Sequence, residues 1–172
     1  MGAAQSEQRP LGEHELMSST AYLELPDFVA LWERYDRMTR GQQAELRRAT
    51  EPDDLTLKPA LYRLLPGIQP RNQYLRIAFL LPWLTHQPNA TSFSAQCAKA
   101  QVNEARLFQV ARSNDPLDMI QLRRLAMQIK PVVNWAAFGE TIWRWRQTGQ
   151  YAKRKLIEDY YLAQYSAKGT LI

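Results

Sequence analysis

The sequence predicts an all-α protein built from two small helical-bundle lobes, with about eight helices and no sheet. First, apolar residues recur at steps of three and four through most of the chain, which is the period of a helix with one buried face. Second, capping residues and first-turn prolines precede several of these runs. Third, no stretch alternates apolar and polar residues over the length of a strand. With 172 residues, 45% of them hydrophobic, the chain can bury a core.

The N-terminal lobe is predicted over residues 21–90, after a flexible acidic tail at 1–20. Residues 28–38 place five large apolar side chains on one helical face. Thr39 and Gln42 fit a capping box that starts a second helix through "AELRRA". The segment "EPDDL" (51–55) reads as a loop, and Pro59 suits the first turn of the next helix. A further helix over 69–84 is expected to end or kink near Pro82. The predicted face of the first helix consists of Phe28, Leu31, Trp32, Tyr35 and Met38.

The C-terminal lobe is predicted over residues 91–172. The polar stretch "THQPNATSFS" (85–94) is the clearest break and reads as the link between the lobes. Asn103 and Asn134 are placed to cap two helices, and Asp115 followed by Pro116 has the pattern of a cap with a first-turn proline. Pro131 closes the helix between them. The last helix is expected over 151–165, "YAKRKLIEDYYLAQY".

Charge is distributed unevenly along the chain. Residues 1–33 carry one arginine and six acidic residues, a net charge of −5. Because the whole chain has a net charge of +5, the remaining residues carry about +10. The cations are 16 arginines and only 6 lysines. Arginine presents a planar fork of donors that matches phosphate oxygens and stacks on flat rings. This composition favours a nucleic-acid partner without requiring one.

The residues that would build an active site are scarce. His14 and His86 have no partners at metal-ligand spacing, and no glycine-rich phosphate loop is present. The single cysteine, Cys97, reads as a small buried residue, and capping explains the pairs Asp53–Asp54 and Asp115–Asp118. We therefore predict no catalytic residues, no metal site, no cofactor and no enzymatic activity.

The cellular setting follows from two further features. One cysteine allows no intrachain disulfide, which suits a reducing cytoplasm. The N-terminus lacks a signal-peptide core, and the longest apolar run, "IAFLLPWL" (77–84), is too short to span a bilayer. We expect a cytoplasmic protein that does not bind membranes.

Two copies of Leu-Arg-Arg stand in different halves of the chain, at 46–48 and 122–124. On a helical wheel each pair of arginines spans the border of the apolar stripe and the open side. Three interpretations remain open: a solvated face whose arginine stems cover apolar surface, internal ion pairs, or a clamp for phosphates. The "WRWR" stretch at 143–146 allows base stacking, although tryptophan at helical spacing is more often core.

Long stretches of the chain resemble the CasB family, the small subunit of the type I-E CRISPR surveillance complex called Cascade. In the first half the resemblance is carried by "LRRATEPDDL" and "PALYRLL". In the second half it is carried by the stretch from "VNEARLFQVARSNDP" to "GETIWRW" and by "KRKLIEDYYL". The resemblance covers roughly residues 27–165 and keeps the order and spacing of the segments.

The resemblance implies a non-catalytic subunit of two helical lobes that acts in antiviral defence. Its implied partners are guide RNA, the target and non-target DNA strands, the backbone and large Cascade subunits, and a second copy of itself. It implies that backbone contacts, independent of sequence, stabilise guide–target pairing and the displaced strand in the R-loop. The implied nucleic-acid-binding residues are Arg47, Arg48, Arg71, Arg106, Arg112, Arg123 and Arg124, with a looser match at Lys153 and Arg154.

Arg76 adds another cation to this predicted surface. Two features depart from the family pattern: the acidic tail before Asp27, and a linker over 85–98 that contains no Lys or Arg. The alternative function is a helical protein–protein adaptor that binds no nucleic acid. A metal-dependent nuclease and a sequence-specific helix-turn-helix repressor are further rivals.

Overall fold

The structure is a computed structural model that describes residues 25–169 of the chain. The all-α class is confirmed, and within this range there are nine α-helices, three short 3₁₀ helices and two strands of two residues each. The α-helices are α2 (Phe28–Asp36), α3 (Arg40–Arg47), α4 (Pro59–Leu64), α5 (Asn72–Leu80), α6 (Phe93–Lys99), α7 (Glu104–Arg112), α8 (Leu117–Ile129), α9 (Trp135–Trp143) and α10 (Tyr151–Ala167). The other elements are η1 (Pro52–Leu57), η2 (Leu81–Trp83), η3 (Thr148–Gln150), β1 (Thr85–His86) and β2 (Val132–Val133).

Several helix starts follow the predicted local chemistry. The Thr39 hydroxyl accepts a hydrogen bond from the Gln42 backbone N–H at 3.2 Å, and the Gln42 side chain accepts one from the Thr39 N–H at 3.0 Å. This reciprocal capping box begins α3. Asn103 and Asn134 accept N–H groups in the first turns of α7 and α9, and Pro59 opens α4. Local sequence therefore fixes these four boundaries.

Other local predictions were wrong. The "EPDDL" segment is not a loop, because η1 begins at Pro52. Asp115 does not cap α8, because its carboxylate pairs with Arg146 instead. Helix α6 was not predicted, and β1 and β2 form a short parallel ladder where no sheet was expected. The ladder joins the first half of the chain to the second, so neither half alone could reveal it.

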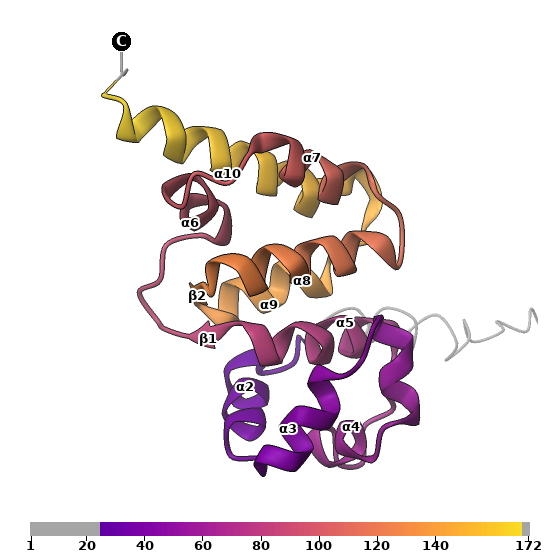
Figure 1. Cartoon of the computed structure of the whole chain (residues 1–172). Coiled ribbons are helices and arrows are strands. Elements are labelled where there is room, and N and C mark those ends of the chain that lie inside the picture. Colours follow the sequence, from indigo (N-terminus) through magenta and orange to yellow (C-terminus); the bar gives the residue numbers. More distant parts are fainter. Residues whose placement is uncertain (1–24, 170–172) are drawn as a thin grey trace, which may run out of the picture.

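The helices stack in three tiers (Figure 1). Helices α6, α7 and α10 form one end, α8 and α9 form the middle, and α5 with α2, α3 and α4 forms the other end. Helix α9, which belongs to the second half of the chain, packs on α5 and α2 from the first half. The proposed division into lobes at residue 90 stays a prediction, and the acidic tail at 1–20 lies outside the described residues.

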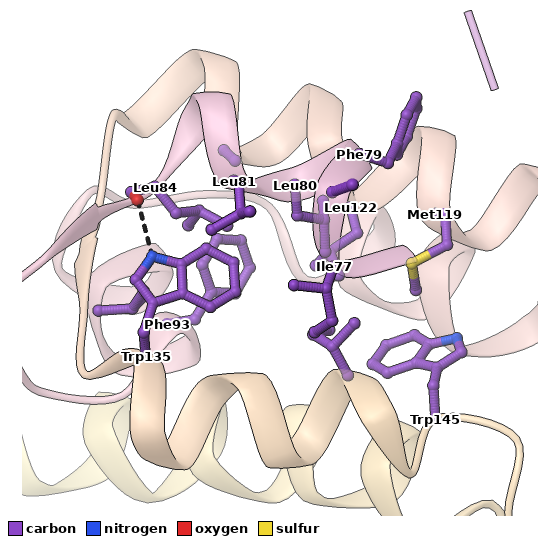
Figure 2. Close-up of a cluster of buried hydrophobic side chains, with 14 of the residues drawn as sticks. Ile77, Phe79, Leu80, Leu81, Leu84, Phe93, Met119, Leu122, Trp135 and Trp145 are labelled. Carbon is purple, nitrogen blue, oxygen red and sulfur yellow. Dashed lines mark hydrogen bonds between the residues drawn. The ribbon is translucent and has the colours of Figure 1, made fainter. Parts of the chain in front are cut away.

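One hydrophobic cluster runs through both halves of the chain. Figure 2 shows side chains from α5, η2, α6, α8 and α9 in this cluster, in which the Trp135 indole N–H donates to the Leu84 carbonyl at 2.9 Å. Gly139 of α9 lies so close to Phe28 of α2 that a Cβ atom there would come within 2.3 Å of the ring. The two halves therefore share one packed interior.

No helix in the described part of the chain is both long enough and apolar enough to cross a membrane.

Candidate nucleic-acid interface

The two Leu-Arg-Arg motifs lie next to each other in space. Arg123 of α8 donates one guanidinium N–H to the Ala49 carbonyl and another to the Thr50 carbonyl, the latter at 3.3 Å. These carbonyls follow the end of α3, where the first motif lies, and helix ends leave such carbonyls without intrahelical partners. The Arg123 guanidinium also lies 4.3 Å from the centre of the Phe79 ring. Arg123 thus fastens α8 to the end of α3.

The Arg123 side chain is only partly exposed to solvent. Burial lowers the pKa of its guanidinium, the like charge of Arg124 adds to that shift, and Asp54 opposes it. The Arg123 Nε atom is buried and has no hydrogen-bond partner. Because its donors are largely committed inside the protein, Arg123 orders the surface but offers little to an external phosphate.

The neighbours of Arg123 in the two motifs point outward. Arg47, Arg48 and Arg124 are all exposed. Arg47 lies close enough to Tyr35 for its positive charge to oppose the burial that raises the pKa of that phenol. Within the described range, Arg48 and Arg124 have no ion pair or hydrogen bond from their side chains. Their guanidinium groups are therefore available to a ligand.

Helix α7 extends this cationic region beside α8. Arg106 of α7 donates to the side chain of Gln128 of α8, which lies one helical turn beyond Arg124. Arg112, at the end of α7, is exposed and lies 4.9 Å from the centre of the Phe108 ring. The arginine stems thus rest on packed side chains while the charged groups reach solvent.

Arg71 and Arg154 complete the exposed members of the predicted set. Arg71 precedes the first residue of α5, and Arg154 lies in the first turn of α10. Both side chains are exposed and make no hydrogen bond or ion pair with the described residues.

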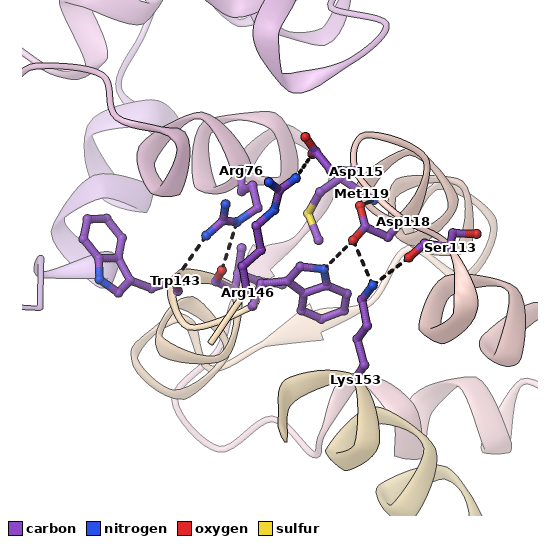
Figure 3. Close-up of polar contacts among 10 residues, drawn as sticks. Arg76, Ser113, Asp115, Asp118, Met119, Trp143, Arg146 and Lys153 are labelled. Carbon is purple, nitrogen blue, oxygen red and sulfur yellow. Dashed lines mark hydrogen bonds and ion pairs between the residues drawn. The ribbon is translucent and has the colours of Figure 1, made fainter. Parts of the chain in front are cut away.

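Arg76 does not belong to an exposed surface, contrary to our expectation. It is only 4% exposed, and it donates to the carbonyls of Ile142 and Trp143 at 3.3 and 3.1 Å (Figure 3). These carbonyls end α9, so Arg76 of α5 stabilises a helix C-terminus. Burial and the nearby charge of Arg146 lower its pKa to about 10, which leaves it charged at neutral pH.

Lys153 is also buried and must be removed from the predicted surface. Its ammonium lies 3.1 Å from an Asp118 carboxylate oxygen and donates to the Ser113 carbonyl at 2.7 Å (Figure 3). The same carboxylate oxygen accepts the Trp145 indole N–H at 2.9 Å. Because each charge here is paired and hydrogen bonded, the cluster joins α8 and α10 to the end of α7 and to the segment after α9 without leaving a charge unpaired.

The tryptophans of "WRWR" lie in the interior or at its edge. Trp145 is 3% exposed, and half-buried Trp143 packs against Tyr74 and Phe28, with ring centres 4.9 and 6.0 Å away. This arrangement favours the core interpretation over a stacking platform. The intervening Arg144 pairs with Glu140 at 2.9 Å.

The residues considered for catalysis have structural roles in the described part of the chain. Burial raises the pKa of the Cys97 thiol to about 12, so it is protonated at neutral pH. His86 accepts the Trp135 backbone N–H through Nδ1 at 3.1 Å. Asp54 accepts hydrogen bonds from Thr50 and Glu51, and those from Thr50 are the main reason that its pKa is lowered. Residues 25–169 contain no cluster of three or more side chains suited to hold a metal.

Comparisons with known proteins agree with the arrangement of the helices. No family model matches the chain. The Cascade subunit CasB of Escherichia coli K12 is 34% identical, over 79% of this chain and 93% of that protein. The chain belongs to the CasB family. The chain also matches one chain in the crystal structure of E. coli Cascade bound to a PAM-containing double-stranded DNA target, with a TM-score of 0.73 and 31% identity over 81% of this chain and 99% of that one.

Sequence analysis missed the part played by Gln128 in this CasB-family surface. Its side chain receives the Arg106 hydrogen bond and so joins α7 to α8. The spacing of four residues between Arg124 and Gln128 places them on one helical face, but only the packing of α7 reveals the contact.

Proposed function

We propose that this protein is a non-catalytic subunit of a type I-E Cascade complex, in which it binds the backbones of nucleic-acid strands. Its identity to CasB over most of both chains supports membership of such a complex. Assembly would bring it against guide RNA, target and displaced DNA strands, the backbone and large subunits, and a second copy of itself. We propose that this complex acts in the cytoplasm.

The observation that carries the proposal is the position of Arg48 and Arg124. These two exposed side chains come from opposite halves of the chain, and the Arg123 contacts to Ala49 and Thr50 join the two backbone segments that carry them. Arg47, Arg106 and Arg112 add positive charge on the same three helices, α3, α7 and α8. Guanidinium groups so displayed can contact phosphate oxygens without reading base edges.

In a guide-RNA complex, base pairing carries the sequence information and the protein needs only to stabilise the strands. The exchange of DNA pairing for RNA–DNA pairing is nearly balanced, so a few phosphate contacts shift it toward the open state. Arg71 and Arg154 extend the proposed binding set beyond α3, α7 and α8.

A gel-shift titration tests backbone binding. The double variant Arg48→Ala with Arg124→Ala should bind single-stranded DNA more weakly than wild type at low salt, to the same degree on two unrelated sequences. Arg37→Ala with Arg63→Ala removes the same charge from exposed arginines of the α2–α4 region and serves as the control. Equal affinities for wild type and both double variants would favour an adaptor that binds only protein.

Two further experiments address assembly and catalysis. Co-expression with the other Cascade subunits and a guide RNA should yield one co-purifying complex that contains this chain. Incubation of the pure protein with Mg²⁺ or Mn²⁺ and labelled DNA or RNA should leave the strands intact. Metal-dependent cleavage that survives further purification would contradict the non-catalytic role.

A further inference from the structure

A row of aromatic rings lies along the seam between α7 and α10. The row, here named the aromatic strip, consists of Phe108, Tyr161 and Tyr165. The ring centres of Phe108 and Tyr161 are 6.5 Å apart, and those of Tyr161 and Tyr165 are 6.4 Å apart with an angle of 26° between the ring planes. Figure 1 shows α7 and α10 side by side at one end of the molecule.

The aromatic strip begins at the edge of the core, against which Tyr161 packs, and reaches solvent at Tyr165. Tyr165 is 55% exposed, and Phe108 and Tyr161 are only half-buried. The buried side of α10 is formed by other residues, including Ala152, Leu156 and Tyr160. Packing within this chain accounts for the buried parts of Phe108 and Tyr161, but it does not account for the exposed ring of Tyr165.

Arginines stand at one end of the aromatic strip. Arg112 lies over the Phe108 ring at 4.9 Å. On α10, Arg154 precedes Tyr161 by seven residues and Tyr165 by eleven, so the three share one helical face. The helices run in opposite directions, because Lys153 contacts Ser113 while Tyr161 contacts Glu104. Arg112 and Arg154 therefore lie toward the same end of the seam.

We propose that the aromatic strip and these two arginines bind a short length of single-stranded nucleic acid, with its bases stacked on the rings and its phosphates at the guanidinium groups. Exposed rings beside cations are the chemistry of single-strand binding that does not depend on sequence. Eleven helical residues span about 16 Å. At roughly 3.4 Å for each stacked nucleotide, this length suits no more than about five nucleotides.

Two carboxylates define how a strand would lie. The Tyr161 hydroxyl donates to Glu104 at 2.6 Å, which holds the ring and, as the main cause, raises the pKa of the phenol to about 12. Tyr161 is therefore uncharged at neutral pH. Glu158 is exposed on α10 between Arg154 and Tyr161 and would repel a phosphate. Removing this charge, as in Glu158→Gln, should therefore strengthen binding.

This inference rests on the proposed function, since it names a site for the same class of ligand. The test compares two fluorescent strands of equal length at one salt concentration: oligothymidylate and an abasic strand with the same phosphates. Wild type should bind the strand with bases more tightly. Tyr165→Ala should reduce that preference by about fivefold or more. Glu158→Gln should tighten binding to both strands, because it removes a charge but no ring.

Tyr62→Ala is the matched control, since Tyr62 is also an exposed tyrosine but lies on α4. It should keep the wild-type preference for bases. Equal affinity of wild type for the two strands would overturn the stacking site while leaving phosphate binding intact. No binding to either strand would contradict the proposed function itself. If Tyr165→Ala keeps the preference for bases but fails to co-purify with Cascade subunits, the strip docks protein and this inference is wrong.

Discussion

The two Leu-Arg-Arg motifs have the same letters and different environments. In α3, Leu46 is buried and both following arginines are exposed. In α8, Leu122 is buried and Arg124 is exposed, but Arg123 turns toward the end of α3 and donates to the carbonyls of Ala49 and Thr50, which follow that helix. The residues that follow the first motif thus accept the hydrogen bonds that Arg123 of the second motif donates.

The difference shows that neighbouring helices decide what an arginine does. A wheel places both arginine pairs at the border of an apolar stripe, where either a solvent contact or a tertiary contact is possible. Helix α3 ends beside α8, so Arg123 finds unpaired carbonyls within reach. Arg76 and Lys153 follow the same rule, because buried carbonyls or a carboxylate meet each of them.

The largest expected effect is on the inward-facing cations. Asp118→Ala should lower the free energy of unfolding by about 3 to 5 kcal/mol, since it leaves Lys153 buried without its counter-charge. Urea unfolding followed by circular dichroism measures the change. Asp159→Ala, which removes the half-buried partner of exposed Lys155, should cost less than about 1 kcal/mol. Equal losses in the two variants would show that the Asp118 pair is not buried as described.

A smaller loss should distinguish the adjacent arginines of α8. Arg123→Ala should lower the free energy of unfolding by about 2 kcal/mol, because it removes two hydrogen bonds to the carbonyls that follow α3 and the contact with Phe79. Arg124→Ala should change stability by no more than about 0.5 kcal/mol. The same unfolding experiment compares both. If Arg124→Ala were the more damaging, the assignment of the two roles would be reversed.

The smallest expected effect concerns the first motif. Arg47→Ala and Arg48→Ala should each change stability by less than about 0.5 kcal/mol, since both side chains are exposed. Each should weaken binding to single-stranded DNA and reduce the slope of log affinity against log salt by up to about 0.7. Titrations at several salt concentrations measure this slope. An unchanged slope in both variants would remove the first motif from the binding surface.

Much of the fold could be predicted because its signals are local. The Thr39–Gln42 capping box, the Asn103 and Asn134 caps and Pro59 each act within one turn of helix. Asp115 failed as a cap because Arg146, distant in sequence, binds its carboxylate. The β1–β2 ladder likewise joins residues almost fifty positions apart. Such contacts depend on tertiary packing, which no local pattern encodes.

The candidate site also combines features that local sequence predicts with features that depend on tertiary packing. The sequence identified the cations, and eight of the ten predicted residues reach the surface fully or in part. It could not separate Arg76 and Lys153 from the others, because the burial of a long cation depends on partners from other helices. The Gln128 contact and the aromatic strip were missed for the same reason, since each spans two helices.

The most direct test of the account is the salt dependence of single-strand binding by wild type and by Arg48→Ala with Arg124→Ala. If these guanidinium groups each contact a phosphate, the double variant should lose about 1.4 from the slope of log affinity against log salt, with unchanged stability. Arg37→Ala with Arg63→Ala should keep the wild-type slope. Identical slopes for all three proteins would contradict the claim that the exposed arginines of the two motifs bind the nucleic-acid backbone.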